Sequence, residues 1–392
     1  MRTSRWAQSY AVQITHIRSQ KILLPFHGTG SGGIRSEARV EKTIFRNRQK
    51  QMGIRESRTW YYLKRPPLRT LLLLLAVLLF LFFCYLVWSP GKRVYDGRYD
   101  LRSNGIWLQH GWLGDDKWFS VNRRDKSKFR DAKKIEELAG LLKNHGITYA
   151  YPHLCPSSPR GDLPPVDNEQ TEKFLDAMEG VDVLPWIGGV YEGCCYPDSE
   201  KWRKRFVSSI VELLQAHPRL AGIHVNIEPM PDNNKGYILL LKEIKSSIPA
   251  GKIVSVAAYP PPTRWHPYPD VHWGKNYYFE IANEVDQLAV MMYDTSIRLP
   301  KIYQKLMSDW TREIIPWCGN TQVLLGVPSY DDSGVGYHFN SVENLENSIR
   351  GINAGLSKFK ELPKNYSGIA LYCEWETDET EWMFFKEEFE KK

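Results

Sequence analysis

From residue 105 onward, the chain alternates short apolar or β-branched runs with longer amphipathic stretches. Short runs of this kind are typical of buried parallel strands, and the stretches between them carry apolar residues at helical spacing, as Ile135, Leu138 and Leu142 do. We expect strands at residues 105–112, 146–154, 181–187, 220–228, 252–259, 285–294, 321–330 and 367–375. We expect helices at residues 129–144, 169–179, 199–216, 235–248, 276–283, 300–314, 342–360 and 379–391.

Eight strand–helix pairs in about 290 residues predict an α/β fold, a (β/α)8 TIM barrel over residues 105–392. A doubly wound sheet that binds a nucleotide is the other fold with alternating strands and helices. It fits less well, because no Gly-rich phosphate-binding loop follows the first expected strand.

One uninterrupted apolar run precedes the barrel, from Leu71 to Trp88. Its eighteen residues carry no charge, and a run of this length can span the hydrocarbon core of a bilayer as a helix. A cleaved signal peptide would have a shorter apolar core followed by small residues, whereas bulky residues such as Tyr85 close this run. We therefore expect an uncleaved transmembrane anchor at residues 68–89 and a linker at residues 90–104.

The positive charge of the chain is concentrated before this anchor. Residues 1–69 hold fifteen Lys and Arg against three Glu. Because basic flanks of a membrane helix stay on the cytoplasmic side, we expect a cytoplasmic N-terminus, a disordered tail at residues 1–67, and a periplasmic or extracellular barrel. Removing these twelve net positive charges from the total of +7 leaves about −5 for the rest. The folded domain is therefore not expected to bind nucleic acid.

Site residues of a (β/α)8 barrel lie at the C-terminal ends of its strands. Here those ends are rich in aromatic and polar side chains: His110, Trp112, His153, Trp186, His224, Asn226, Glu228, Tyr259, Tyr293, Asp294, Tyr330, Asp331, Tyr372, Glu374 and Trp375. Aromatic faces pack on the C–H faces of sugars, and the polar groups between them can bond hydroxyls and amides. The set indicates a carbohydrate site, with rim packing as the other interpretation of any single aromatic.

Glu228 is the strongest catalytic candidate. It ends a strand in which apolar residues alternate with His224, Asn226 and Glu228, so these three side chains face the barrel mouth together. A carboxylate that is partly desolvated among aromatic side chains has a raised pKa and can act as a general acid toward a leaving oxygen. The alternative is a structural carboxylate that caps a loop.

Three segments resemble, in chain order, the strand-four, strand-six and strand-eight motifs of family 18 glycoside hydrolases. They are GIHVNIE, MMYD and SGIALY followed by WETD. The fourth strand of that family reads D-x-x-D-x-D-x-E and ends in the catalytic acid. In this register Glu228 matches the acid, while Ala221, His224 and Asn226 occupy the three Asp positions.

The resemblance implies substrate-assisted hydrolysis, in which the 2-acetamido oxygen of the sugar attacks the anomeric carbon. Asn226 stands where the family has the Asp that holds the acetamide, and the related endo-β-N-acetylglucosaminidases of family 85 use an Asn-x-Glu pair. Tyr293 and Asp294 match the M-x-Y-D element, whose Tyr bonds the acetamido oxygen. Tyr372 stands at the register of the Trp that forms the floor of the −1 subsite, and Trp375 follows three residues later.

The sequence therefore predicts a membrane-anchored glycoside hydrolase-like protein that acts on an N-acetylhexosamine-containing polysaccharide outside the cytoplasm. The expected catalytic residues are Glu228, Asn226 and Tyr293. The expected substrate-binding residues are His110, Trp112, His153, Trp186, His224, Asp294, Tyr330, Tyr372 and Trp375. No cofactor is implied.

Two other functions fit the same residues. A classical retaining glycosidase would pair Glu228 with a second carboxylate, such as Asp331 or Glu374, about 5 Å away. A non-catalytic glycan-binding barrel would account for the missing aspartates of the family motif.

A metal-dependent hydrolase built on His110, His153 and His224 is disfavoured. It would need a His-x-His pair or comparable ligand spacing, and the sequence has neither that pair nor a C-x-x-C pair among its six cysteines. We therefore expect no metal site.

Overall fold

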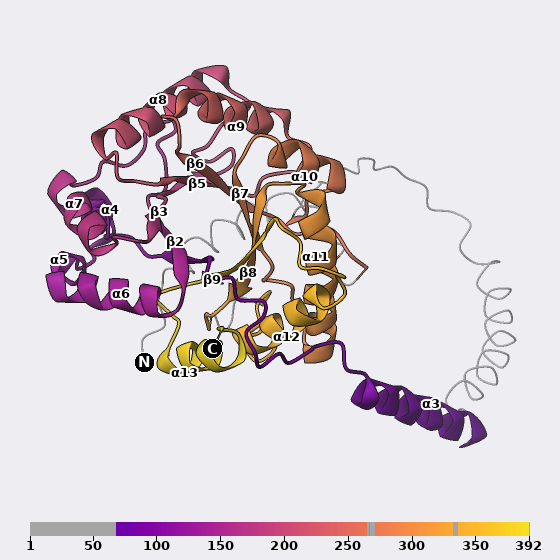
Figure 1. The fold of residues 1–392 in the computed structure, drawn as a ribbon. Coiled ribbons are helices and arrows are strands. Elements are labelled where there is room, and N and C mark those ends of the chain that lie inside the picture. The colour runs from indigo at the N-terminus through magenta and orange to yellow at the C-terminus, as the bar shows by residue number, and fades with distance from the viewer. Residues whose placement is uncertain (1–67, 265, 267–270, 332–335, 392) are drawn as a thin grey trace, which may run out of the picture. The chain divides into compact units, whose positions relative to one another are not determined.

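The computed structural model describes residues 68–391, apart from 265, 267–270 and 332–335 (Figure 1). The basic tail predicted at residues 1–67 lies outside the described residues. The described residues belong to two units, one that contains helix α3 (Leu68–Val87) and a compact unit that begins at Pro90.

Helix α3 is 20 residues long, and none of its residues is buried within the protein. Within the described part of the chain, it is the one helix that is long and apolar enough to cross a membrane. It coincides with the predicted anchor at residues 68–89. Its length matches the thickness of a bilayer's hydrocarbon core.

A parallel sheet forms the centre of the larger unit, with its strands in the order β3-β2-β1-β9-β8-β7-β6-β5-β4 (Figure 1). The strands are β1 (Asn104–Leu108), β2 (Ile147–Pro152), β3 (Asp182–Val183), β4 (Trp186–Val190), β5 (Gly222–Glu228), β6 (Ile253–Ala258), β7 (Gln287–Met291), β8 (Gln322–Pro328) and β9 (Tyr366–Tyr372). Each predicted strand region overlaps an observed strand, and the third region contains β3 and the first two residues of β4.

Strands β3 and β4 are halves of one barrel strand. Pro185 lies between them and has no backbone N–H, so the ladder is interrupted there. Pairing nevertheless continues on both sides, because Leu154 N donates to Trp186 O at 2.7 Å and His224 N donates to Pro185 O at 2.9 Å. This strand closes the sheet, and the predicted (β/α)8 barrel is confirmed.

Helices lie around the outside of the sheet (Figure 1). They are α4 (Asp116–Asn122), α5 (Ser127–Arg130), α6 (Ala132–Asn144), α7 (Asn168–Ala177), α8 (Glu200–Ala216), α9 (Lys235–Ser247), α10 (Lys275–Ala282), α11 (Pro300–Trp317), α12 (Leu345–Leu356) and α13 (Glu379–Glu388). Several begin at a capping side chain, as at Ser199 before α8 and Asn344 before α12. The predicted helices are present, and the structure adds α4 and separates α5 from α6.

Buried side chains form two layers. The larger layer lies between the sheet and the helices and includes Ile106 of β1. The inner layer fills the barrel and includes Trp107, Tyr151 and Leu324. A Cβ at Gly105 would contact both Tyr151 and Leu324, so Gly105 and Trp107 face inward while Ile106 faces outward.

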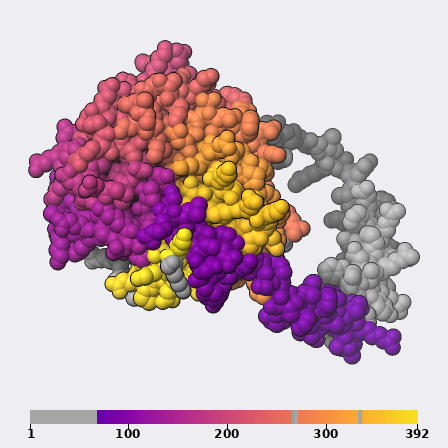
Figure 2. All heavy atoms as spheres, in the orientation of Figure 1, coloured from indigo at the N-terminus to yellow at the C-terminus, as the bar shows by residue number. Residues whose placement is uncertain are grey.

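Residues 90–104 were predicted as a linker, and several of them contact the barrel. Lys92 N donates to Arg350 O at 2.8 Å, and the buried Asp100 accepts a hydrogen bond from Lys391 N at 3.0 Å. Figure 2 shows the indigo start of this unit beside the yellow surface near its end. These contacts join the beginning of the unit to its last residues.

Candidate active site

The end of β5 carries the three polar side chains that alternation predicted. Register with β4 sets His224 beside Trp186, Asn226 beside Gly188, and Glu228 beside Val190. Gly188 has a φ of +126°, and a Cβ there would lie 2.1 Å from the carbonyl oxygen of Asn226. Only glycine fits this close approach, which fixes the backbone that carries Asn226.

Two side chains bond the carboxyl group of Glu228. Asn226 Nδ2 donates to Oε1 at 2.7 Å, and the hydroxyl of Tyr259, which follows β6, donates to Oε2 at 3.1 Å. Burial raises the pKa of Glu228, the negative charge of Asp294 raises it further, and the two hydrogen bonds partly offset this. The carboxyl group therefore keeps its proton to a higher pH than an ordinary Glu.

The amide of Asn226 has one unused acceptor. The NH2 group of Asn226 donates to Glu228, so the amide oxygen points elsewhere. This Oδ1 atom is buried and has no hydrogen-bond partner within the described part of the chain. Unpaired buried acceptors are uncommon in folded proteins, and one beside a candidate acid is a place for a ligand donor.

His224 is fully buried beneath this pair. Its Nε2 accepts a 3.1 Å hydrogen bond from the indole of Trp107, which can only donate, so the ring proton lies on Nδ1. Nδ1 donates to Ser255 Oγ at 2.8 Å, and Ser255 donates to Gln287 Oε1 at 2.8 Å. Burial lowers the pKa of His224 to about 3. This predicted substrate-binding residue is therefore neutral, and both of its nitrogens are used within the barrel.

Tyr372, at the end of β9, is the centre of an aromatic cluster. Its ring stacks on Tyr293 with centroids 5.3 Å apart, and Tyr330 meets it edge-on at 5.3 Å. Trp375 and Trp186 lie 5.7 and 6.3 Å away. Five residues predicted at four different strand ends are thus brought together.

Tyr293 and Asp294 follow β7 and lie close to Glu228. Burial raises the pKa of Tyr293, and the neighbouring Tyr372 and the charge of Glu228 raise it further. The Tyr293 hydroxyl makes no hydrogen bond within the described residues. Asp294 has a φ of +60°, a left-handed conformation that Asp tolerates better than most residues, and it accepts a hydrogen bond from the Tyr330 hydroxyl.

His110 and His153 lie at the ends of β1 and β2. His110 Nδ1 pairs with Asp115, and the two histidine rings have centroids 3.9 Å apart. His153 also lies against Trp186, at 4.0 Å, which places it beside the aromatic cluster. Burial lowers the pKa of both histidines, to about 3 for His110. They offer neutral rings to the site.

Trp112 occupies a different environment from the other predicted residues. Strand β1 ends at Leu108 rather than at Trp112, because Gly111 turns the chain with a φ of +103°. Trp112 is 1% exposed, and its ring packs against Phe129 and Phe174. This is the position of a core residue and not of a substrate-binding one, so the prediction for Trp112 is wrong.

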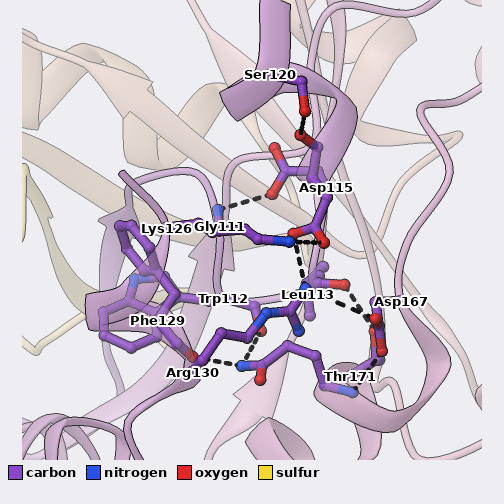
Figure 3. Close-up of polar contacts among 12 residues, drawn as sticks. Gly111, Trp112, Leu113, Asp115, Ser120, Lys126, Phe129, Arg130, Asp167 and Thr171 are labelled. Atoms are coloured by element: carbon purple, nitrogen blue, oxygen red, sulfur yellow. Dashed lines mark hydrogen bonds and ion pairs between the residues drawn. The ribbon is translucent and has the colours of Figure 1, made fainter. Parts of the chain in front are cut away.

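Ion pairs hold the loop that follows β1 (Figure 3). Arg130 lies 2.7 Å from Asp116 and 3.6 Å from Asp167, and Gln170 Nε2 donates to the backbone oxygen of Trp112 at 3.2 Å. These contacts tie the loop to the neighbouring helices α5 and α7. The loop that carries His110 is therefore held in position by these contacts.

The second carboxylates that a classical retaining glycosidase would use are engaged elsewhere. Glu374 accepts a hydrogen bond from Gln109 at 3.2 Å, and Asp331 accepts one from a loop Asn at 3.0 Å. The carboxylate whose charge acts on Glu228 is Asp294. Among the described residues, no group of three or more His, Cys, Asp or Glu side chains has a geometry that could hold a metal ion.

Several residues around the site were not given a role from the sequence. Trp107 was missed because the first strand was expected to run too far, although alternation from Gly105 would have placed its side chain inside. Tyr259 was noted only as a strand-end residue. His338 and Glu343, which lie near Asp294, are outside every predicted strand end. Glu343 falls within the helix predicted at residues 342–360, although α12 begins only at Leu345.

Comparison with known proteins gives the family. Residues 120–386 match the sequence profile described as Glycosyl hydrolases family 18. The spore cortex-lytic enzyme SleL of Bacillus megaterium has the same fold, with 15% identity over 74% of this chain and 76% of that chain, and a TM-score of 0.50. A chitinase from Chromobacterium violaceum aligns with 13% identity over 74% of this chain and 100% of its own, with a TM-score of 0.49. Comparison with curated proteins gave no match.

The profile covers well over half of the chain, including β5 with Glu228 and the segment after β7 with Tyr293 and Asp294. The sequence resemblance is therefore confirmed at the level of the family. The chain belongs to family 18 of the glycosyl hydrolases.

Proposed function

We propose that this protein hydrolyses a polysaccharide that contains N-acetylhexosamine, with Glu228 as the general acid. Membership of family 18 supports a glycosidase. The observation that carries the finer proposal is the pair formed by Glu228 and Asn226. A carboxyl group with a raised pKa lies beside a buried amide oxygen that lacks a partner.

Glu228 acts first as an acid and then as a base. Its proton passes to the glycosidic oxygen as the bond to the anomeric carbon breaks, and the resulting carboxylate later takes a proton from the attacking water. A raised pKa suits the first step, because the group keeps its proton to a higher pH than an ordinary Glu does. General acid catalysis of this kind typically contributes about 10²–10⁴-fold to the rate.

The acetamido group of the substrate supplies the nucleophile. Its carbonyl oxygen attacks the anomeric carbon while its N–H donates to Asn226 Oδ1, and the Tyr293 hydroxyl donates to the same carbonyl oxygen. Asn226 offers a dipole rather than a negative charge to the oxazolinium cation that forms. Water then opens this ring and restores the acetamide. No enzyme carboxylate becomes covalently attached.

The aromatic cluster around Tyr372 binds the sugar rings. Aromatic side chains present apolar faces to C–H groups, while the buried His153, whose Nε2 makes no hydrogen bond within the described residues, offers a neutral ring nitrogen to a hydroxyl. Tyr372 takes the place of the family's Trp in the floor of the −1 subsite, and Trp375 extends the surface. A neutral polysaccharide fits these groups.

Helix α3 anchors the protein in a membrane, with the N-terminus in the cytoplasm and the barrel outside. The support is its length, its apolar composition and the basic residues that precede it. A C-terminal epitope accessible on intact cells before permeabilisation is the expected result. Accessibility only after permeabilisation would reverse the orientation.

The test of the glycosidase uses the full chain in detergent with chitin oligosaccharides, peptidoglycan and poly-N-acetylglucosamine, and mass spectrometry detects new reducing ends. We expect cleavage of at least one substrate by the wild type and a loss of about 10²–10⁴-fold in Glu228→Gln. Glu374→Gln is the matched control, because it removes a carboxylate at the rim that is bonded to Gln109. It should retain activity within about threefold.

The outcomes separate the competing functions. Equal loss in Glu228→Gln and Glu374→Gln would favour a retaining mechanism with two enzyme carboxylates. Binding without cleavage by the wild type and both variants would contradict the glycosidase and leave a glycan-binding barrel.

A further inference from the structure

A second group of buried titratable side chains lies next to Asp294. His338 is 3% exposed and Glu343 is fully buried. His338 Nδ1 lies 3.4 Å from Asp294 Oδ1 and 3.9 Å from Glu343 Oε2. None of the proposed steps of hydrolysis uses these two residues, so their burial side by side needs another explanation.

The hydrogen bonds fix one proton of His338. Its Nε2 lies 3.2 Å from the backbone oxygen of Tyr330, which can only accept, so Nε2 carries a proton. Nδ1 then faces two carboxyl groups. A bare Nδ1 lone pair opposite two carboxylates would be repulsive, so the neighbourhood favours a second proton, on Nδ1 or on Glu343. The cluster therefore holds one proton between the imidazole and Glu343.

The backbone conformation supports the same arrangement. Asp294 and Ser296 both have left-handed φ angles, +60° and +59°. This turn directs the N–H of Thr295 to Glu343 Oε2 at 2.8 Å. Glu343 Oε1 makes no hydrogen bond within the described residues. A strained turn held from behind by a buried carboxyl group is typical of a positioned functional segment.

Among the described residues, His338 is the one cationic side chain that pairs with Asp294 or Glu343. The titratable groups that face the His338–Glu343 pair are Asp294 after β7, Tyr330 after β8 and Tyr303 of α11. Tyr303 donates to a backbone oxygen at 3.2 Å and Tyr330 donates to Asp294. Both tyrosines are neutral. The proton shared by His338 and Glu343 therefore balances the negative charge of Asp294.

We propose that His338 and Glu343 are positioning residues for the reaction: they hold one proton behind Asp294 and so keep its carboxylate in place beside Glu228. Asp294 in turn contributes to the protonation of the acid. When the proton leaves, His338 presents a lone pair to Asp294, and the carboxylate is repelled from its position. This inference rests on the proposed function of Glu228.

The direction of the pKa shifts agrees with the geometry. Burial raises the pKa of Glu343 to about 7. For His338, burial lowers the pKa, but the carboxylates of Asp294 and Glu343 outweigh it, and the net change is upward. Both groups thus hold protons to a higher pH in the folded protein than in the unfolded chain. The proton is present in acid and is lost as the pH rises.

The test is the pH dependence of kcat/KM for the full chain with a chitin oligosaccharide, in the wild type, Glu343→Gln and His338→Gln. Glu343→Gln removes one of the two carboxylates that hold the proton, so the alkaline decline should begin at lower pH. We expect activity near that of the wild type at pH 5 and a deficit that grows to about tenfold by pH 8, which corresponds to about one pKa unit. His338→Gln removes the proton site, and the deficit should be present at every pH.

Glu381→Gln is the matched control. Burial raises the pKa of Glu381 to about 7 as well, but this residue lies in the capping box of α13. It should not change the shape of the profile. A Glu343→Gln deficit of constant size across the pH range, or no deficit, would overturn the proposal, because a purely structural role does not move a titration.

A second readout does not depend on turnover. The melting temperature of the wild type should decrease between about pH 5 and 7, and Glu343→Gln should lack this decrease. In that range the unfolded chain has lost the Glu343 proton while the folded state still holds it. If this difference appears while no substrate is cleaved, the cluster exists and the proposed glycosidase fails. If turnover is found but neither the profile nor the melting difference appears, the cluster is not the positioning device.

Discussion

The pKa values of two buried histidines near the site are shifted in opposite directions. His224 is surrounded by the neutral partners Trp107 and Ser255, and burial lowers its pKa to about 3. His338 is almost as buried, but it faces the carboxyl groups of Asp294 and Glu343, and its pKa is raised. Burial alone therefore does not decide the charge of a histidine here; the partners do.

The difference shows where charge lies around Glu228. On β5, the family's aspartates are replaced by Asn226 and the neutral His224, so this side of the site carries no charge besides Glu228 itself. The remaining carboxylate that acts on Glu228 is Asp294, and its counter-proton is held by His338 and Glu343. The neutral network serves as a scaffold, and the charged network is the one we expect to respond to pH.

The largest expected effect comes from breaking the neutral network. His224→Leu leaves the buried indole N–H of Trp107 and the hydroxyl of Ser255 without their partner, and we expect a loss of about 3–5 kcal/mol in the free energy of unfolding. His224→Gln, which can restore one of these bonds, should lose less. Denaturant unfolding at pH 7 measures both, and an equal loss in the two variants would contradict the assigned hydrogen bonds.

Next in size is the pH dependence of stability, which should have opposite signs for the two histidines. The folded pKa of His224 lies below the ordinary 6.5, so its contribution to stability is present above about pH 6.5 and is lost as the pH falls, by about 1.4 kcal/mol per unit. The folded pKa of His338 is raised, so its contribution is present in acid and is lost as the pH rises through that value.

Denaturant unfolding from pH 4.5 to 8 of the wild type, His224→Gln and His338→Gln checks this contrast. The difference between wild type and variant cancels the other titrating groups. For His224→Gln, this difference in the free energy of unfolding should become smaller as the pH falls. For His338→Gln, it should become smaller as the pH rises. If the stability difference changed with pH in the same direction for both variants, the opposite pKa shifts of the two histidines would be contradicted.

A smaller effect should follow when charge is returned to β5. Asn226→Asp places a carboxylate where Nδ2 now donates to Glu228 at 2.7 Å. Like charges at this distance raise the pKa of the acid. The pH at which kcat/KM declines on the alkaline side should therefore increase by about one pH unit. Asn226→Ala, which removes the amide without adding charge, is the control. An alkaline decline of kcat/KM that stays at the same pH or shifts to lower pH in Asn226→Asp would contradict the assigned role of this pair.

The barrel could be predicted because its determinants are local and repeated. Alternating apolar runs and amphipathic stretches mark each strand and helix, and strand alternation placed His224, Asn226 and Glu228 on one side without any structure. The motif after β7 likewise pointed to Tyr293 and Asp294. These residues lie at strand ends, where position along the chain converts into position in the fold.

The remaining parts of the site depend on contacts that the sequence does not encode locally. Trp112 was assigned to the mouth because the glycine turn that ends β1 early was not recognised. The occupation of both His224 nitrogens depends on Trp107 and Ser255, which come from two other strands. Glu343 lies ahead of a helix, and its burial against the turn at Asp294 arises only from packing after β7 and β8 are in place.

The most direct test of the central claim compares two sets of chitin oligosaccharides of equal length, one fully N-acetylated and one N-deacetylated, with the wild-type full chain and Glu228→Gln. We predict that the wild type cleaves the acetylated set, that Glu228→Gln is slower by about 10²–10⁴-fold, and that the deacetylated set stays intact because it lacks the nucleophile. Equal cleavage of both sets would contradict substrate assistance. Binding of the acetylated set without any new reducing end would contradict the glycosidase itself.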